Sequence, residues 1–428
     1  MALTGSAWAH DRQESDVEPS HVIEVKAADS ETRSAIANLG FAIDEVLSDK
    51  VYIYGKPSDA KRLQDAGFKT SAFELQKSWL QWSESATDAK EKYRSYGEVA
   101  GRMTELARAY PALVTELSIG RSTENRNMPL MRISGVSAGD AETNKLPVVF
   151  FMGCHHAREH LSVETPLRFM EYLLDQYGKN PDVTRLVDSR EIYIAPIINP
   201  DGYIYDKKPA GGGRLWRKNR RQNSDGTFGV DLNRNYGFHW GTGGSSTDTS
   251  SEVYMGTEPF SEVEARNVRD FVRSQPRMRV LLTFHTFSEL VLYPWGHTRD
   301  QIGDHIGTKE DFAIYSKMAN DMAAWNHYKP EQSSDLYIAS GDTTDWSYGE
   351  LGIFSFTFEL TPKSQFNGGF YPEPTVIQPT FEANLKPMMY MLEFANDPKR
   401  VLTEKIPNFL DTPSRRGIAL ASFGDLQF

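Results

Sequence analysis

The sequence feature that most constrains the fold is the run of β-branched and aromatic residues at 148–152, which ends at Gly153. A continuous apolar run of this length is typical of a strand buried on both faces of a sheet. Similar runs alternate with long helical patterns from Tyr93 onward, which favours a mixed, mostly parallel sheet with helices on both faces, an α/β fold. We predict strands at 114–119, 130–133, 148–152, 192–198, 280–284 and 354–358, and helices at 96–110, 161–177, 262–274, 310–326 and 381–394.

The residues before this α/β domain form a smaller pattern of their own. Two helical stretches, each followed by a glycine, lie between short strand-like runs. The order β-α-β-β-α-β is that of the split-βαβ, ferredoxin-like unit, so we predict a small α+β domain ahead of the main body. Its strands are predicted at 21–25, 41–46, 51–54 and 68–73, and its helices at 30–39 and 58–66.

These patterns divide the chain into five parts. Residues 21–75 would form the small domain, 93–398 the main domain, and 76–92 a charged, cleavable connector. Residues 1–20 are polar and acidic; their small-x-small segment at 6–9 fits either the remnant of a signal peptide or a nondescript tail. Residues 399–428 form a C-terminal extension to which we assign no role.

Charge and cysteine content limit the classes of function. The chain of 428 residues has a formal net charge of −11 and no Lys/Arg cluster interleaved with aromatic residues, so we expect no nucleic-acid partner. No apolar run approaches the ~18 residues of a membrane-spanning helix, so we expect no membrane insertion. The single cysteine, Cys154, excludes an intrachain disulfide, which by itself favours a reducing compartment.

Metal-binding side chains directly follow the strand at 148–152. His156 and Glu159 are three residues apart, so in a helical turn they would offer two ligands to a divalent cation, most naturally Zn²⁺. His285 ends the strand at 280–284 and is either a hydrogen-bonded core residue or the third ligand of a His₂Glu set, which leaves the open position that catalytic zinc needs. His155 would leave the strand on the side opposite to its neighbour His156. His160, His239 and His297 have no spacing like that of His156 and Glu159.

Two further groups of residues could take part in chemistry. Glu359 ends the strand at 354–358 and is either paired with an arginine or placed as a general base beside a metal and its water. The loop segments 216–221 and 231–236 are dense in Arg and Asn. They form either a solvated basic patch or a set of donors for a carboxylate or an oxyanion.

Seven ordered motifs resemble the zinc carboxypeptidase family, the M14 metallocarboxypeptidases, over roughly residues 93–398. The resemblance implies a zinc-dependent exopeptidase with one Zn²⁺ per catalytic domain, acting on peptide or protein C-termini. The motifs are 156–159 (His-Ala-Arg-Glu), 199–203 (Asn-Pro-Asp-Gly-Tyr), 216–220 (Trp-Arg-Lys-Asn-Arg), 231–235 (Asp-Leu-Asn-Arg-Asn), His285, Tyr337 and 356–360 (Phe-Thr-Phe-Glu-Leu).

The resemblance also implies catalytic roles at these positions. His156, Glu159 and His285 would hold the zinc ion. Arg217 would stabilise the oxyanion, a contribution typically worth ~10²–10³ in rate for one such donor. Glu359 would be the general base that later hands its proton to the leaving amine.

Substrate binding is implied in the same way. Asn233, Arg234 and Tyr337 would bind the terminal carboxylate of the substrate, with Arg158 as an auxiliary contact. An arginine that requires a free carboxylate would explain cleavage of the last peptide bond alone. Asp231 would not bind the zinc ion itself but would orient the imidazole of one of the histidines that do.

A finer resemblance, carried by residues 332–337 and 341–346, is to the bacterial carboxypeptidase T subgroup. In the digestive enzymes an apolar residue at the position of Thr344 goes with apolar C-termini, and an Asp with Lys or Arg. Here Thr344 is a neutral hydroxyl and Asp342 lies two residues earlier, so we predict that apolar and basic C-terminal residues are both accepted, with Asp342 meeting the cation. Asp342 could equally be a turn residue that caps its own backbone.

The small domain resembles the inhibitory prodomains of these enzymes in size, position and element order, although no motif matches. This implies a zymogen whose connector is cut by an activating protease, and a secreted bacterial protein, extracellular or periplasmic. We also expect a monomer. One departure from the family lies after Leu360, where Thr361-Pro362 replaces a segment that commonly contains Arg, and where we expect a cis-proline.

Two other functions remain open. A pseudoenzyme that binds C-terminal carboxylates without cleaving them would usually have lost a metal ligand or the base, and this chain keeps them all. A zinc deacylase or cell-wall amidopeptidase on the same scaffold would tend to lack the carboxylate-binding Asn-Arg pair and the Tyr, which are also present.

Overall fold

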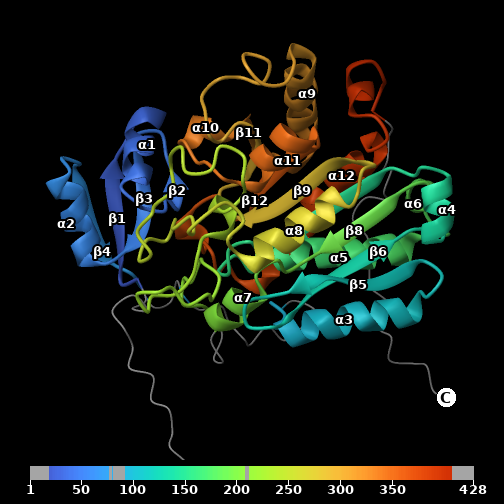
Figure 1. Ribbon diagram of the computed structural model, residues 1–428, viewed down its shortest axis with the longest axis horizontal. Coiled ribbons are helices and arrows are strands. Elements are labelled where there is room, and N and C mark those ends of the chain that lie inside the picture. Colours follow the sequence, from blue (N-terminus) through green and yellow to red (C-terminus); the bar gives the residue numbers. More distant parts are fainter. Residues whose placement is uncertain (1–18, 77–79, 81–91, 208–211, 407–428) are drawn as a thin grey trace, which may run out of the picture.

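A computed structural model describes residues 19–76, 80, 92–207 and 212–406 of the chain, and its strands form two sheets (Figure 1). A four-stranded sheet has the order β2-β3-β1-β4, and an eight-stranded sheet has the order β11-β10-β12-β9-β7-β8-β6-β5. The first belongs to a small N-terminal unit and the second to the rest of the chain. The predicted α/β fold with a small α+β unit ahead of it is confirmed.

The small unit has the predicted element order. Every strand pair in it is antiparallel, and its two helices pack on one core whose apolar side chains include Ile23, Ile36, Ile53 and Leu63. The elements are β1 (His21–Lys26), α1 (Ser30–Asn38), β2 (Glu45–Val46), β3 (Lys50–Gly55), α2 (Pro57–Asp65) and β4 (Thr70–Glu74).

The strand predicted at 41–46 is mostly wrong, because only Glu45 and Val46 join the sheet. The side chains of Phe41 and Ile43 pack in the core of the small unit, but the chain on either side of them also contacts the large unit. The backbone oxygen of Gly40 accepts a hydrogen bond from Ser251 Oγ at 2.6 Å, and Asp44 reaches Arg158. These contacts with a distant part of the chain outweigh the local strand pattern.

The middle of the large sheet is parallel. Strands β8, β7, β9 and β12 are neighbours and run the same way, and antiparallel strands flank them on both sides. The strands are β5 (Val114–Arg121), β6 (Asn127–Ile133), β7 (Val148–Gly153), β8 (Glu191–Ala195), β9 (Met278–Thr286), β10 (Leu290–Tyr293), β11 (Lys329–Gln332) and β12 (Phe354–Leu360). The sequence did not predict β10 and β11, which have only four residues each.

Helices cover both faces of this sheet, since alternate side chains of a strand point to opposite sides. Val149 and Phe151 of β7 share one core with α5 and α12, whereas Phe150 and Met152 share the other with α8. The helices are α3 (Tyr96–Ala109), α4 (Ala138–Thr143), α5 (Leu161–Gln176), α6 (Pro181–Asp188), α7 (Pro200–Asp206), α8 (Val263–Arg273), α9 (Lys309–Asn326), α10 (Ser333–Leu336), α11 (Thr343–Leu351) and α12 (Ile377–Phe394).

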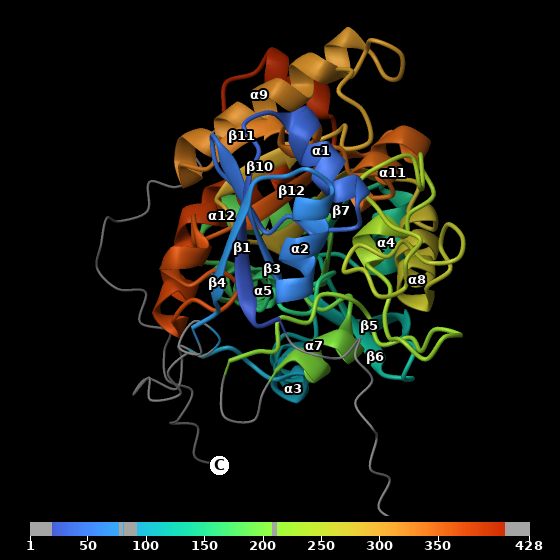
Figure 2. The same cartoon turned by 90° about the vertical axis from the view of Figure 1, so that its left-hand side faces the viewer.

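Gly153 marks the end of β7 because a side chain would not fit there. A Cβ atom at this position would lie 2.1 Å from the backbone oxygen of Ser162 in α5. The glycine therefore lets the chain turn tightly from the strand toward the helix, and residues 154–160 occupy that turn at the carboxyl end of the sheet. In Figure 2 the small unit faces the viewer, and β7, β10 and β12 lie behind it.

The tail at 1–20, the connector at 76–92 and the C-terminal extension fall largely outside the described residues, and residues 407–428 lie outside them entirely. The peptide bond between Thr361 and Pro362 is cis, as predicted. No helix in the described ranges combines the length and apolar character that crossing a bilayer would require.

Candidate active site

Three neighbouring strands bring the predicted metal ligands and the predicted base together. His285 lies near the end of β9, and Glu359 is its register partner on β12. His156 and Glu159 follow the end of β7, whose Gly153 pairs with Phe284. Because the carboxyl ends of parallel strands meet at one edge of a sheet, residues 129 positions apart in the chain lie side by side.

The atoms of His156, Glu159 and His285 that could bind a metal all lie within 4.8 Å of one another. His156 Nδ1 is 2.6 Å from Glu159 Oε1, His285 Nδ1 is 2.9 Å from Glu159 Oε2, and the two imidazole nitrogens are 3.2 Å apart. All three side chains are buried. Nitrogens that each lie 2.0–2.1 Å from a tetrahedral Zn²⁺ are about 3.3 Å apart, so this donor set fits zinc.

The electrostatics of the three residues also favour a cation. Burial alone would raise the pKa of Glu159, but His156 and His285 outweigh it and hold that pKa well below its usual range. Oε2 of Glu159 is buried, and no described residue donates a hydrogen bond to it with acceptable geometry. An ionised, partly unsatisfied carboxylate between two imidazoles is suited to binding a divalent metal.

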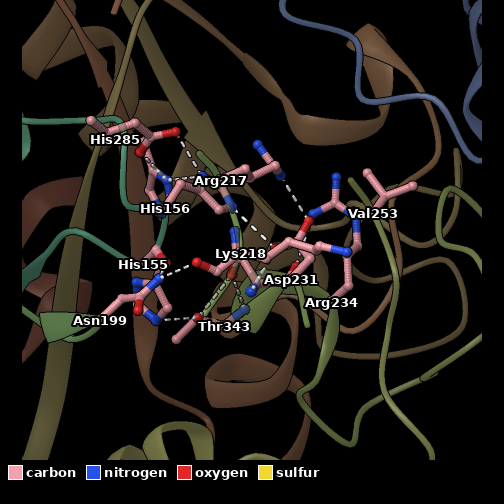
Figure 3. A network of polar contacts seen from close by, with 12 residues as sticks. His155, His156, Asn199, Arg217, Lys218, Asp231, Arg234, Val253, His285 and Thr343 are labelled. Atoms are coloured by element: carbon pink, nitrogen blue, oxygen red, sulfur yellow. Dashed lines mark hydrogen bonds and ion pairs between the residues drawn. The ribbon is translucent and has the colours of Figure 1, made fainter. Parts of the chain in front are cut away.

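Asp231 lies behind this group and joins it to Arg217 (Figure 3). Its Oδ1 is 3.2 Å from His156 Nε2, and its Oδ2 accepts from Arg217 Nε at 3.0 Å and lies 2.9 Å from Nη2. Burial would raise the pKa of Asp231, but Arg217 and His156 hold it well below its usual range. Asp231 therefore stays ionised and fixes both side chains.

Glu359 faces the same space. Burial and the negative charge of Glu159 raise its pKa to about 8, while His156, Arg217 and Arg234 oppose the rise. A divalent cation nearby would lower this pKa, because an opposite charge favours the carboxylate. The environment thus suits a group that takes up and releases a proton near neutral pH.

Asn233 and Arg234 are held by their backbone and side-chain contacts. Thr343 donates to Asn233 Oδ1 from its backbone nitrogen at 3.0 Å and from its hydroxyl at 2.9 Å, which leaves Nδ2 of Asn233 as a donor. Arg234 donates from Nε to the oxygen of Gly244 at 3.0 Å and from Nη1 to the oxygen of Asn233 at 2.8 Å. Both residues border a cavity between the small unit and the large one.

A cavity of about 720 Å³ lies between the small unit and the large one. Residues 43–48 and Arg33 border it from the small unit. His285 and Asp231 lie behind it, and both contact His156. The predicted site residues that line the cavity are His156, Arg158, Glu159, Arg217, Asn233, Arg234, Tyr337, Asp342, Thr344 and Glu359.

Two of these residues contact the small unit. Arg158 Nη2 is 2.5 Å from Asp44 Oδ1, and both side chains are about 2% exposed. The guanidinium also lies over the ring of Phe370, 4.1 Å from its centroid. Tyr337 is partly buried, and its hydroxyl is 3.5 Å from the backbone oxygen of Ile43.

Asp342 has the capping role that was one of the two alternatives left open by the sequence, and its contact with a substrate cation stays a prediction. Its Oδ1 accepts from the backbone nitrogens of Thr344 and Asp345 and from the hydroxyl of Thr344, so it caps α11. It also lines the cavity beside Gly296, where a Cβ atom would lie 2.9 Å from Asp342 Oδ2. Burial and the charge of Asp345 raise its pKa to about 7.

His155 and Thr343 are site residues that the sequence did not indicate. His155 Nε2 is 3.2 Å from the hydroxyl of Thr343 and 2.9 Å from that of Tyr236, and its ring stacks on His285 with centroids 5.6 Å apart (Figure 3). Through Thr343 this contact reaches Asn233. The adjacent histidine pair at 155–156 was the available signal, but its partners come from distant loops.

Comparisons with known proteins agree with this geometry. The family model described as zinc carboxypeptidase matches residues 99–387. A zinc carboxypeptidase of Saccharothrix mutabilis subsp. capreolus is 31% identical over 89% of this chain and 90% of its own length. Carboxypeptidase B of Astacus astacus is 34% identical over 71% of this chain and 97% of its own length.

Solved structures share the fold of both units. The thrombin-activatable fibrinolysis inhibitor superimposes with a TM-score of 0.71 at 25% identity, covering 89% of this chain and 99% of that one. A carboxypeptidase A from Helicoverpa armigera gives a TM-score of 0.74 at 23% identity over 91% and 100% of the two chains. The chain belongs to the zinc carboxypeptidase family and is a zinc-dependent metallocarboxypeptidase, a hydrolase of peptide bonds.

Proposed function

We propose that the chain is the zymogen of a secreted zinc exopeptidase that removes apolar and basic residues from the C-termini of peptides and proteins. The observation that carries the proposal is that Asp44 of the small unit binds Arg158 inside the cavity that holds the metal ligands. A carboxylate bound to an arginine in this cavity occupies the kind of position that a substrate carboxylate would take.

His156, Glu159 and His285 would hold the metal. When bound, Zn²⁺ supplies Lewis-acid chemistry, lowering the pKa of a water molecule toward 7 and polarising a carbonyl group. Glu359 would accept the proton of the attacking water and pass it to the leaving amine. Arg217, fixed by Asp231, would donate to the oxygen on which negative charge develops, so it would stabilise the transition state more than the bound substrate.

The other basic and amide groups would restrict cleavage to the end of a chain. Arg234 and Asn233 present donors to the cavity, and Arg158 and Tyr337 lie on its border. An internal peptide has no carboxylate for these donors, so the buried donors would be left unpaired in its complex. This is the physical reason to propose exopeptidase activity.

The small unit would act as an inhibitory prodomain. It holds the chain on both sides of Tyr337: Arg33 Nε donates to the oxygen of Leu336 at 2.6 Å, and Ser34 Oγ accepts from the nitrogen of Ile338 at 2.9 Å. Asn38 adds a contact to Gly244, whose oxygen binds Arg234. The contacts of the small unit thus surround the proposed carboxylate site.

Activation would require cleavage of the connector at 76–92 by another protease. A protease made inactive in this way suits export to the extracellular space or periplasm of a bacterium, and we propose that the protein acts as a monomer. After cleavage, the prodomain at 21–75 would dissociate together with the tail before it and open the cavity to peptide C-termini.

Dual side-chain preference would come from two residues of the cavity wall at the start of α11, Asp342 and Thr344. Thr344 is neutral and lines the cavity, so it would accept apolar side chains, whereas Asp342 could meet a lysine or arginine. Because the pKa of Asp342 is raised to about 7, its charge would depend on pH in the physiological range.

Zinc binding should depend on His285. We expect His285→Ala to lower zinc affinity at least about a hundredfold, because one of three protein ligands is lost. Zinc content after equilibrium dialysis measures this, with His305→Ala as the control, since the side chain of His305 is 76% exposed. Equal zinc retention by both variants would contradict the ligand assignment.

Hydrolysis should require a free C-terminal carboxylate. We expect a blocked dipeptide with a free C-terminus to be cleaved at least about a thousandfold faster, in kcat/KM, than the same dipeptide with an amidated C-terminus, because buried donors reject a ligand that cannot pair with them. The assay uses protein activated by limited proteolysis, with and without chelator. Comparable cleavage of both substrates would instead favour the deacylase or amidopeptidase alternative.

Asp44 should hold the prodomain in place. Removing one partner of a buried ion pair typically costs ~3–5 kcal/mol, so Asp44→Ala should raise the activity of the uncleaved protein by about a hundredfold or more. Asp49→Ala is the control, since Asp49 pairs with Lys26 on the exposed face of the same unit. An uncleaved Asp44→Ala protein as inactive as the unmodified chain would argue against autoinhibition through this contact.

The preference for basic residues should rise with pH. A carboxyl group with a pKa of about 7 is mostly neutral at pH 6 and mostly charged at pH 8, so the ratio of kcat/KM for C-terminal Arg over Leu should increase across this range by about tenfold. Asp342→Asn keeps a good helix cap and should abolish the increase. Asp335→Asn, which alters a more exposed carboxylate on the same cavity, should keep it; a flat ratio in the unmodified protein would rule out the role of Asp342.

A further inference from the structure

Three successive backbone amides directly before Arg217 donate hydrogen bonds to two buried polar side chains that also bind each other. Arg214 N and Trp216 N donate to Asp206 Oδ1 at 3.1 and 2.8 Å, and Leu215 N donates to the hydroxyl of Tyr371 at 2.7 Å. That hydroxyl donates in turn to the carboxylate of Asp206, with distances of 2.9 and 3.0 Å to its two oxygens. Asp206 and Tyr371 therefore bind this stretch of backbone together.

His160 completes the group, which we name the Asp206 cluster: Asp206, Tyr371 and His160. His160 Nε2 is 2.8 Å from Asp206 Oδ2. Asp206 and His160 are fully buried and Tyr371 is 3% exposed. The three side chains come from the end of α7, from the residue after Glu159 and from the loop after β12, so three distant segments converge under the loop that carries Arg217.

The path of this loop is unusual and depends on those contacts. Leu215 has a φ of 62°, which is uncommon for a residue with a side chain. Gly213 packs on the ring of Tyr371 so closely that a Cβ atom would lie 2.1 Å from it. At the other end, Ala157 N donates to the oxygen of Arg217 at 3.0 Å, which ties the loop to the segment of the metal ligands.

Asp206 and Asp231 thus hold different parts of the same arginine. Asp231 binds the guanidinium group of Arg217, whereas the Asp206 cluster fixes the backbone that leads to its Cα atom. A donor to a developing oxyanion is effective only when it is held about 2.7–3.1 Å from that oxygen in advance. A displacement of about 1 Å can cost about a hundredfold in rate.

We propose that Asp206, Tyr371 and His160 are positioning residues for the reaction, which keep Arg217 where it can stabilise the oxyanion. The proposal rests on the role of Arg217 in the proposed function. None of the three touches the substrate cavity, so their contribution would pass through the 214–217 backbone.

The test is Tyr371→Phe, which removes the hydroxyl that binds Leu215 N and leaves the ring in place. In protein activated by proteolysis and loaded with zinc, we expect kcat to fall about tenfold and KM to change less than about twofold, with unchanged zinc content. Tyr390→Phe is the matched control, because the buried hydroxyl of Tyr390 also donates to an aspartate, Asp321, at 2.7 Å. Its kcat should not change, although thermal stability should fall comparably in both variants.

A double-mutant cycle separates positioning from a general structural effect. In an Arg217→Ala background, Tyr371→Phe should change kcat less than about twofold, because the group that it positions is absent. The same decrease of kcat in both backgrounds would overturn the positioning role alone. Arg217→Ala with unchanged kcat would instead overturn the oxyanion role on which the proposal rests.

A second variant, His160→Leu, leaves the amide contacts of Asp206 intact. It should show the same non-additivity with a smaller decrease of kcat, and it carries the test if Tyr371→Phe does not fold.

Discussion

The carboxylate of Asp231 is the interaction on which the rest of the site depends. One of its oxygens binds the imidazole of His156, which is one of the metal-binding residues, and the other binds the guanidinium of Arg217, which lines the cavity. A buried carboxylate is costly unless it is paired and hydrogen-bonded, and here both partners reduce that cost. The same group therefore fixes the relative position of the His156 and Arg217 side chains, whose backbone segments are joined by the hydrogen bond from Ala157 N to the oxygen of Arg217.

The sheet supplies the other half of this arrangement. Parallel strands place His285 and Glu359 side by side without any loop, because register alone makes them neighbours. Loops then add the residues that need precise direction, and each loop is held from behind: Asn233 by Thr343, and the backbone before Arg217 by Asp206 and Tyr371. A strand carries His285 and the turn after β7 carries His156 and Glu159, whereas buried polar contacts hold the groups around them.

The sequence predicted the parts of this arrangement that depend on local patterns. The order of elements, the spacing of His156 and Glu159 and the placement of His285 at a strand end follow from periodicity and register, and the structure brings these three residues together. Residues whose environment comes from distant segments were not predictable. Residues 41–44 matched a strand pattern, but β2 contains only Glu45 and Val46, and Asp44 contacts Arg158 of the large unit.

The same limit applies to histidines and short strands. In the sequence, His155 was expected to point away from His156, and His160 lacked a matching spacing. Their partners, Thr343 and Asp206, lie 188 and 46 residues away. Strands β10 and β11 pair with neighbouring strands, but they are too short for a periodic pattern of apolar residues to be recognised in the sequence. Asp342 caps a helix, as one of its two interpretations predicted, and it also lines the cavity, so the structure leaves the other interpretation as a prediction.

The position of the small unit has a further consequence for how inhibition would work. Its described contacts reach Arg158, Tyr337 and the chain around Arg234, and none of them joins it to His156, Glu159 or His285. The space between the two units stays open, with a volume of about 720 Å³. If the small unit inhibits by occupying only the proposed carboxylate site, the metal ligands and their buried partners would already be in their final geometry. Activation would then need no rearrangement of the metal centre, because removing the cover also exposes Arg158 to the carboxylate of a substrate in place of Asp44.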